Sequence, residues 1–243
     1  MQQPFRVGIV LLLLLSVSGC GVIDYFFLPP PEDTAQELFE SGQEHMKAKE
    51  YAKAAEAFAR LKDRYPFSPY TPQAEIGLGD SYFLGEDYSQ AVEAYREFEN
   101  LHPRHELIPY VLFQIGRSNY LQFRSIDMPQ AHVADALEYV TRLAQAYPDS
   151  KYAPEAREFM VKCRRYMAEH EVFVADFYWR AEQFGAAWKR YMYAAENFKD
   201  LEEVLDYAKL RAELSYLEYQ KTLTKEERER IDGGWKVWLK KWL

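Results

Sequence analysis

Cysteine and histidine side chains are the first candidates for chemistry, and few of them stand at spacings that a reactive site needs. The chain has two cysteines, Cys20 and Cys163, and five histidines. Cys163 lies in a helix-like stretch, where a single cysteine is usually a small buried apolar residue. His102 and His105 flank Pro103, which favours a solvated turn over a metal site. Motifs of serine hydrolases, zinc proteases and nucleotide-binding loops are absent, so we expect no catalytic residue, no metal site and no cofactor.

Cys20 ends a segment with the order of a secretory signal. Arg6 is followed by the apolar run 7–15 and then by small residues. The stretch from Val17 to Cys20 reads Val-Ser-Gly-Cys and resembles the lipobox of bacterial lipoproteins. This resemblance implies that residues 1–19 are a signal peptide and that the Cys20 thiol carries fatty acids such as palmitate. The alternative is a plain signal peptide or membrane anchor with an incidental cysteine.

Acylation of Cys20 would keep the chain on a membrane, because two or more acyl chains bind stably whereas one binds marginally. The next residue is Gly21 rather than aspartate. By resemblance to bacterial sorting signals, this favours the outer membrane, with the chain facing the periplasm. Residues 20–33 contain three consecutive prolines and indicate an extended tether.

The charge of the chain argues against nucleic acid as a partner. The net charge is −8, and loss of the leader with Arg6, its one charged side chain, leaves −9. Proteins that bind nucleic acid need a basic patch that replaces phosphate counterions. Hydrophobic residues make up 48% of the chain and aromatic residues 16%, enough to build a sizeable core with aromatic seams.

The chain after residue 34 contains two copies of one pattern, 37 residues apart. The shared positions are Gly42, Ala54, Phe58 and Pro66 in the first copy and Gly79, Ala91, Tyr95 and Pro103 in the second. The spacings of 12, 4 and 8 residues are typical of tetratricopeptide (TPR) repeats. In these repeats the small residues let two helices approach, and the proline ends the second helix.

Later copies of the pattern are more divergent. The third, from Gly116 to Pro148, has eight extra residues within about 122–131, which we expect to form a loop between its two helices. A fourth copy lacks the proline. No glycine or proline interrupts residues 155–184, which predicts a helix of about 28 residues joining the third and fourth repeats.

A fifth pair is expected from Glu202 to about Lys221, followed by a helix that a capping box of Thr224 and Glu227 begins. We therefore predict an all-α fold, a TPR-like helical-hairpin solenoid of about five repeats. Residues 34–150 hold repeats 1–3, and residues 151–243 hold repeats 4–5 with an amphipathic terminal helix.

The end of the chain carries three tryptophans on one face of that terminal helix. Trp235, Trp238 and Trp242 share an arc with two leucines, and three lysines occupy the opposite side. One hypothesis is a cap over the exposed face of the last repeat. The other is a helix that docks on a partner protein or at a membrane surface.

The repeat junctions resemble those of the BamD family of outer-membrane assembly lipoproteins. The matching segments are Arg64–Tyr70, Leu101–Tyr110, Tyr147–Tyr152 and Glu171–Tyr178. The resemblance covers about residues 34–200 and implies a non-enzymatic scaffold of the β-barrel assembly (BAM) complex. It implies that the amino-terminal repeats help recognise unfolded outer-membrane proteins and that the carboxyl-terminal repeats dock the membrane-proximal POTRA domain of BamA. Other BAM lipoproteins are possible further partners.

Aromatic residues at the first junction are our candidates for a peptide groove. Phe67 and Tyr70 alternate with prolines, and Tyr82 lies on the following helix. Either both junction rings plug the gap between the first two helix pairs, or at least Tyr70 lines a groove together with Tyr82.

Two rival functions remain at this point. One is another periplasmic TPR lipoprotein, for example an adaptor for peptidoglycan-modifying enzymes. The other is an unrecognised hydrolase, which would need a polar cluster with perturbed pKa values inside a pocket.

Overall fold

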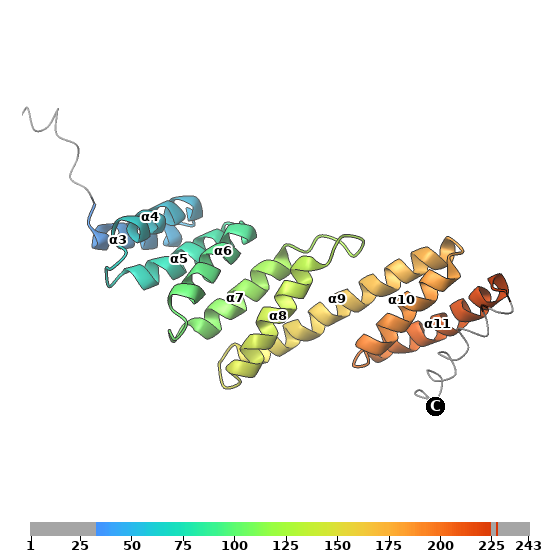
Figure 1. The fold of residues 1–243 in the computed structure, drawn as a ribbon. Coiled ribbons are helices and arrows are strands. Elements are labelled where there is room, and N and C mark those ends of the chain that lie inside the picture. Colours follow the sequence, from blue (N-terminus) through green and yellow to red (C-terminus); the bar gives the residue numbers. More distant parts are fainter. Residues whose placement is uncertain (1–32, 225–226, 228–243) are drawn as a thin grey trace, which may run out of the picture.

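A computed structural model describes residues 33–224 and 227, and this part of the chain folds into nine α-helices without a β-strand (Figure 1). The helices are α3 (Ala35–Lys47), α4 (Tyr51–Arg64), α5 (Thr71–Leu84), α6 (Tyr88–Leu101), α7 (Ile108–Leu121), α8 (Ala131–Ala146), α9 (Ala153–Arg180), α10 (Phe184–Asn197) and α11 (Glu202–Thr222). Consecutive helices form hairpins, which confirms the predicted all-α, TPR-like solenoid. The expected signal peptide, most of the tether and the tryptophan-rich end lie outside the described residues.

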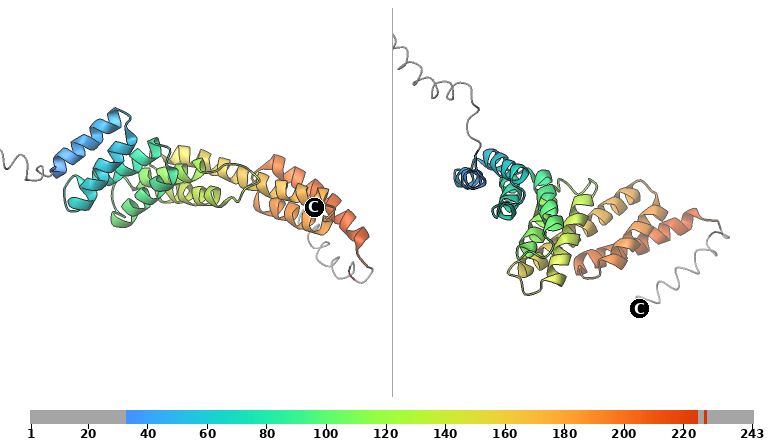
Figure 2. Two further views of the ribbon diagram at one scale, coloured as in Figure 1. Left: turned by 90° about the horizontal axis from the view of Figure 1, so that it is seen from above. Right: turned by 60° about the vertical axis from the view of Figure 1, so that its left-hand side comes forward.

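Each helix packs mainly against the helices before and after it, so the molecule is an elongated, curved row (Figure 2). The buried apolar residues accordingly form separate clusters along the row. One surrounds Phe58 in the first hairpin, one surrounds Tyr95 in the middle, and one surrounds Tyr191 near the carboxyl end. The cohesion of such an array comes from neighbouring units.

The glycines of the TPR pattern let the helices of a pair approach closely. A Cβ atom on Gly42 would lie 2.5 Å from Phe58 Cε1, and one on Gly79 would lie 2.5 Å from Tyr95 Cε1. Such separations are far inside van der Waals contact, so only glycine fits these two positions without a shift. The contact that closes the hairpin is therefore a glycine against an aromatic ring, which agrees with the expectation that the small residues let two helices approach.

Three of the described hairpins use the same tight turn. Lys49, Glu86 and Glu182 each have a φ near +60°, a left-handed conformation that non-glycine residues adopt at a cost. The residue after each donates its amide to a carbonyl near the end of the first helix, as Asp87 does to Tyr82. The third hairpin differs, because residues 122–130 form the loop that the eight extra residues predicted.

The repeat junctions follow the prolines. The residue that caps the carboxyl end of α4, α6 and α8 is Tyr65, His102 and Tyr147, respectively. These three residues have nearly equal backbone angles, with φ between −128° and −133° and ψ between 54° and 58°. Each precedes a proline, which disfavours helical geometry at the residue before it. The next helix in each case has a proline in its first turn, where a missing N–H costs nothing.

The long helix α9 has the length that the sequence predicted. It has 28 residues, from Ala153 to Arg180, and Phe184 begins α10. The turn between these two helices contains Glu182 in a left-handed conformation and no glycine or proline. After α11, the predicted capping box is present, since Thr224 Oγ1 donates to Glu227 Oε2 (2.8 Å) and accepts from the Glu227 amide (3.3 Å).

Candidate interaction site

The first junction holds Phe67 in the solvent. Thr71 Oγ1 donates to the Tyr65 carbonyl (2.6 Å), and the Ser68 amide donates to the same carbonyl (3.0 Å), so the turn is fixed at both ends. The Phe67 side chain projects from this turn and is 99% exposed. The expectation that both junction rings plug the gap between helix pairs is therefore wrong for Phe67.

Tyr70 lies beside a hollow between α3 and α5. Its ring stacks on Phe39, with centroids 5.3 Å apart and an interplanar angle of 28°. Phe39 lines a hollow of about 420 Å³ together with Phe58, Ile76 and Asp80. Tyr70 thus supports the wall of a hollow on the face where the first helices of successive pairs lie side by side.

Tyr82 belongs to a different hollow. It is twelve residues beyond Tyr70 on α5, which is about 18 Å along a helix. There it lines a hollow of about 410 Å³ with Tyr51, Ala55 and Gly85. The structure therefore does not bring the three predicted groove residues together, because Phe67 projects outward and the two tyrosines lie toward opposite ends of one helix.

A carboxylate that sequence reasoning missed ties three helices together at the α3–α5 hollow. Asp80 Oδ1 accepts hydrogen bonds from Tyr95 Oη (2.6 Å) on α6 and from Tyr110 Oη (2.5 Å) on α7. Gln114 Nε2 donates to both hydroxyl oxygens (3.3 and 3.1 Å). Burial raises the pKa of Asp80, and this effect outweighs the two tyrosine hydrogen bonds that lower it.

A second cluster of the same kind lies near the carboxyl end. Asp176 on α9 accepts hydrogen bonds from Tyr191 on α10 and from Tyr207 on α11, the latter at 2.9 Å. Arg211 takes the place of Gln114: its Nε donates to Tyr191 Oη (3.2 Å), and its guanidinium lies 4.3 Å from the ring centroid of Trp179. The signal was present in the sequence as an aspartate with a tyrosine 15 residues on and another 30 or 31 residues on.

The second cluster also borders a hollow. Phe173 and Asp176 of α9 line a space of about 380 Å³ with Val204 and Tyr207 of α11. Phe173 and, one turn further, Phe177 are exposed apolar side chains on α9. The two ends of the row thus offer similar features, an apolar wall beside a tyrosine-bound carboxylate.

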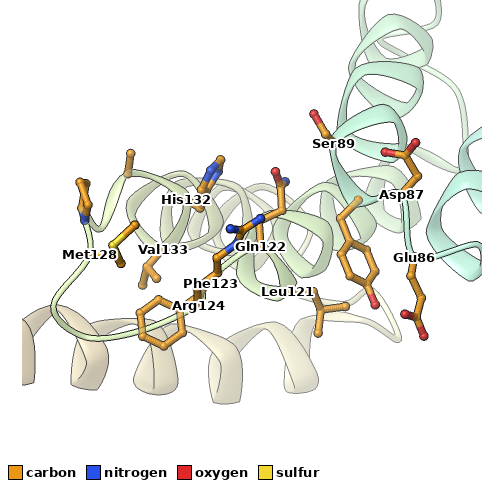
Figure 3. A pocket seen from close by; sticks show the side chains of 13 residues that line it. Glu86, Asp87, Ser89, Leu121, Gln122, Phe123, Arg124, Met128, His132 and Val133 are labelled. Carbon is orange, nitrogen blue, oxygen red and sulfur yellow. The ribbon is translucent and has the colours of Figure 1, made fainter.

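A further hollow of about 570 Å³ lies where the inserted loop approaches the preceding repeat (Figure 3). Glu86 and Asp87 come from the α5–α6 turn, and Phe123 and Met128 come from the loop. His132, at the start of α8, also lines it. This hollow has a mixed polar and apolar wall.

The histidines and the cysteine considered as candidates for chemistry make contacts that support the fold. His102 Nε2 lies 2.7 Å from Glu75 Oε2, and the His105 ring packs edge-on against Phe98. Cys163 is buried, and burial raises the pKa of its thiol to about 12, as expected for a small core residue. The described residues contain no group of three or more side chains that could hold a metal ion.

These features define a TPR-like solenoid whose candidate sites are hollows between helices. The chain belongs to the YfiO family of outer membrane lipoproteins, whose family model matches residues 31–230. This family and this fold are those of a non-enzymatic protein, as the sequence predicted. None of the described helices is long and apolar enough to span a membrane.

Curated relatives agree with the family. The chain is 27% identical over 182 residues to the outer membrane protein assembly factor BamD of Vibrio cholerae, a match that covers 71% of this chain and 76% of the relative. It is 27% identical over 177 residues to the factor of the same name from Xylella fastidiosa, covering 67% of this chain and 59% of that relative. A solved structure of a putative protein binding protein from Bacteroides ovatus matches 85% of this chain and 99% of its own at 12% identity and a TM-score of 0.31.

Proposed function

We propose that this chain is a lipid-anchored scaffold of the outer-membrane β-barrel assembly machine. It helps recognise unfolded outer-membrane proteins and couples them to BamA for folding and insertion. The observation that carries the proposal is the family match over residues 31–230, together with relatives that bear the name of an assembly factor. The hollows along the row support a role in holding other proteins.

The anchor is the acylated Cys20, which holds the chain on the periplasmic face of the outer membrane. Substitution Cys20→Ala removes the acyl chains and should release the folded chain from the membrane fraction after a salt wash. Cys163→Ala is the matched control. Because Cys163 is buried in the folded chain, this substitution should leave the chain in the membrane fraction. Firm membrane binding of the Cys20→Ala chain would contradict this part of the proposal.

The first repeats supply the surface for unfolded substrate. The α3–α5 hollow has an apolar wall of Phe39, Phe58 and Ile76, and Phe67 stands exposed at the neighbouring junction. Aromatic side chains at such positions suit a substrate segment that is itself rich in aromatic residues. Tyr70 acts here by holding Phe39 in place, and the Tyr82 hollow extends the contact surface.

The last repeats dock the membrane-proximal POTRA domain of BamA. The α9–α11 hollow combines Phe173 and Tyr207 with an exposed Phe177 on the next turn of α9. Exposed aromatic residues beside a hollow are the kind of anchors that dominate the binding energy of interfaces. Other BAM lipoproteins would contact the remaining surface.

The test is a pull-down with the tagged full-length chain from detergent-solubilised outer membranes. Co-purification of BamA is expected, and a Phe173→Ala/Phe177→Ala chain should lose most of it. Val161→Ala is the matched control, since Val161 is an exposed apolar residue of the same helix that lies outside the hollow. Recovery of peptidoglycan-modifying enzymes in place of BamA would favour a cell-wall adaptor and overturn the proposal.

A further inference from the structure

Arg117 on α7 lies against two aromatic rings in the seam between α5 and α7. The central carbon of its guanidinium is 4.9 Å from the ring centroid of Phe83 on α5 and 5.6 Å from that of Phe113 on α7. Aromatic faces attract a cation, and a planar guanidinium stacks on them. The side chain is partly exposed. The two rings therefore hold a positive charge at the surface of this seam.

A chain of buried hydrogen bonds orients the Arg117 side chain. Its Nη1 donates to Gln114 Oε1 (3.2 Å), and Gln114 is 5% exposed. Gln114 Nε2 donates to the hydroxyl oxygens of Tyr95 and Tyr110, and both hydroxyls donate to Asp80. The Gln114 amide group is thus fixed with its oxygen toward the arginine. Arg117 is therefore oriented in advance, which lowers the entropy cost of binding a partner.

Arg117 lacks the carboxylate that comparable arginines have. Four other arginines in the described part of the chain lie over an aromatic ring, and each is within 4.0 Å of a carboxylate oxygen. These pairs are Arg96 with Glu93, Arg142 with Glu99, Arg164 with Asp200 and Arg211 with Asp176. Arg117 forms no ion pair with a described residue. An arginine has five N–H donors, so the bond to Gln114 leaves donors for an anion from another molecule.

Exposed leucines lie on both sides of this cation. Leu84 is at the end of α5, next to the ring that stacks on Arg117, and Leu121 is one turn beyond Arg117 on α7. They are 47% and 42% exposed. Residues four apart share a face of a helix. Leu121 also lines the 570 Å³ hollow with Phe123 and Met128 (Figure 3). The surface thus has a positive charge between two apolar contacts, one of which borders a hollow.

We propose that this surface binds an extended segment of a partner protein that carries one acidic side chain between apolar residues. The carboxylate accepts charge-assisted hydrogen bonds from the Arg117 guanidinium. An apolar side chain next to it enters the hollow beside Leu121. Apolar contacts on both sides of the cation favour a carboxylate within a segment over one at the end of a chain. Glu86 and Asp87 line the other side of the hollow and would repel a longer acidic run.

This surface lies in the middle of the row and adds a third binding region to the proposed function. The proposed substrate surface is on α3–α5, and the proposed BamA surface is on α9–α11. The Arg117 site therefore does not depend on either assignment. A variant of Arg117 should keep the co-purification of BamA, so failure of one assignment is distinguishable from failure of the other.

Site-specific photo-crosslinking tests the proposal in cells that produce the full-length chain. A benzoyl-phenylalanine in place of Leu84 captures the segment that lies beside Arg117, and mass spectrometry identifies it. We expect a segment with one aspartate or glutamate flanked by apolar residues. Arg117→Met removes the charge and should lower the yield of this crosslink about tenfold, because a hydrogen bond to a charged group contributes this much. Arg96→Met is the matched control, since Arg96 also lies over a ring but already has carboxylate partners.

A charge exchange then tests the contact between the two partners. Arg117→Glu should abolish the crosslink, and so should replacement of the acidic residue of the captured segment by arginine. The two changes together should restore most of the yield, because they rebuild the pair with opposite polarity. Arg117→Lys should give an intermediate yield, since it keeps the charge but loses the planar fork of the guanidinium.

The alternative is that Arg117 only packs α5 against α7. Melting curves address it, because Arg117→Met should lower Tm by no more than about 4 °C if the partner is what needs the charge. An unchanged crosslink in Arg117→Met overturns the proposal. So does a captured segment without an acidic side chain, capture of a chain end or of a lipid, or the absence of any crosslink to another protein.

Discussion

Phe67 and Tyr70 are three residues apart at one junction and have opposite surroundings. Phe67 projects into solvent, whereas Tyr70 stacks on Phe39 beside the α3–α5 hollow. An exposed aromatic ring on a turn that hydrogen bonds hold at both ends loses little entropy when it binds a partner. We therefore expect substitutions at the two positions to have different effects.

We predict that Phe67→Ala leaves Tm within about 2 °C of the parent value, because an exposed side chain contributes less than about 0.5 kcal/mol. It should nevertheless weaken binding of a peptide taken from an aromatic-rich terminal strand of an outer-membrane protein. Tyr70→Ala should cost about 1 kcal/mol or more through loss of the stacked pair. Thermal melting and fluorescence-anisotropy titration of both variants check this, and unchanged binding in Phe67→Ala would exclude Phe67 from the substrate surface.

The carboxylate of Asp80 makes stability depend on pH. Its pKa is raised in the folded chain by burial, from an ordinary value near 3.8. The folded state therefore binds this proton more tightly than the unfolded state does. The protonated Asp80 carboxyl therefore contributes stability that is fully present below its ordinary pKa. This contribution is lost as the pH rises through the raised pKa of the folded chain.

We predict that the Tm of Asp80→Asn minus that of the parent increases as the pH rises from about 4 to 7, because the amide cannot titrate. Asp200→Asn is a control of opposite sign. The hydrogen bond from Arg164 lowers the pKa of Asp200, so the parent gains stability as the pH rises toward 3.8 and the difference should fall there. Melting curves between pH 3 and 7 check both signs, and the same sign in both variants would contradict this account.

At the scale of helices, local patterns were sufficient for much of the fold. The glycine, aromatic and proline positions predicted the hairpins and their junctions, and extra sequence length predicted the loop at 122–130. The length of α9 was predicted, but its exact end at Arg180 was not, because the turn that follows places Glu182 in a left-handed conformation and contains no glycine or proline. The Asp80 cluster was missed because its members lie on three helices, and only packing brings them together.

The tight contact between α5 and α6 gives a prediction at the scale of helices. Gly79→Ala should destabilise the chain by roughly 1–3 kcal/mol, because its Cβ would lie 2.5 Å from Tyr95 Cε1. Tyr95 is fully buried and bonded to Asp80, so its ring has little room to move. The fourth pair has Ala175 at the equivalent position, and Ala175→Gly is the control that should cost only about 0.5–1 kcal/mol of helix propensity. Urea denaturation measures both, and a stabilised Gly79→Ala chain would refute the tight contact.

The whole molecule is a row of units without a common core. The cluster around Phe58 and the cluster around Tyr191 share no residue and lie toward opposite ends of the row. In such an array, stability is approximately a sum of units and of their nearest-neighbour contacts. The front of the molecule should therefore survive changes at the back, which separates the two proposed binding regions experimentally.

We predict that a chain ending at Asp200 keeps helical circular dichroism and substrate-peptide binding but loses BamA. The cut removes α11, and with it Tyr207 and Val204 from the α9–α11 hollow. It leaves the α3–α5 hollow intact. A chain ending at Leu223 is the matched control, because it retains α11 and should keep BamA. Gel filtration must first show that the Asp200 chain is monomeric, since the cut exposes Tyr191 and its neighbours on α10. Co-purification of BamA with that monomeric chain would show that the docking surface lies elsewhere.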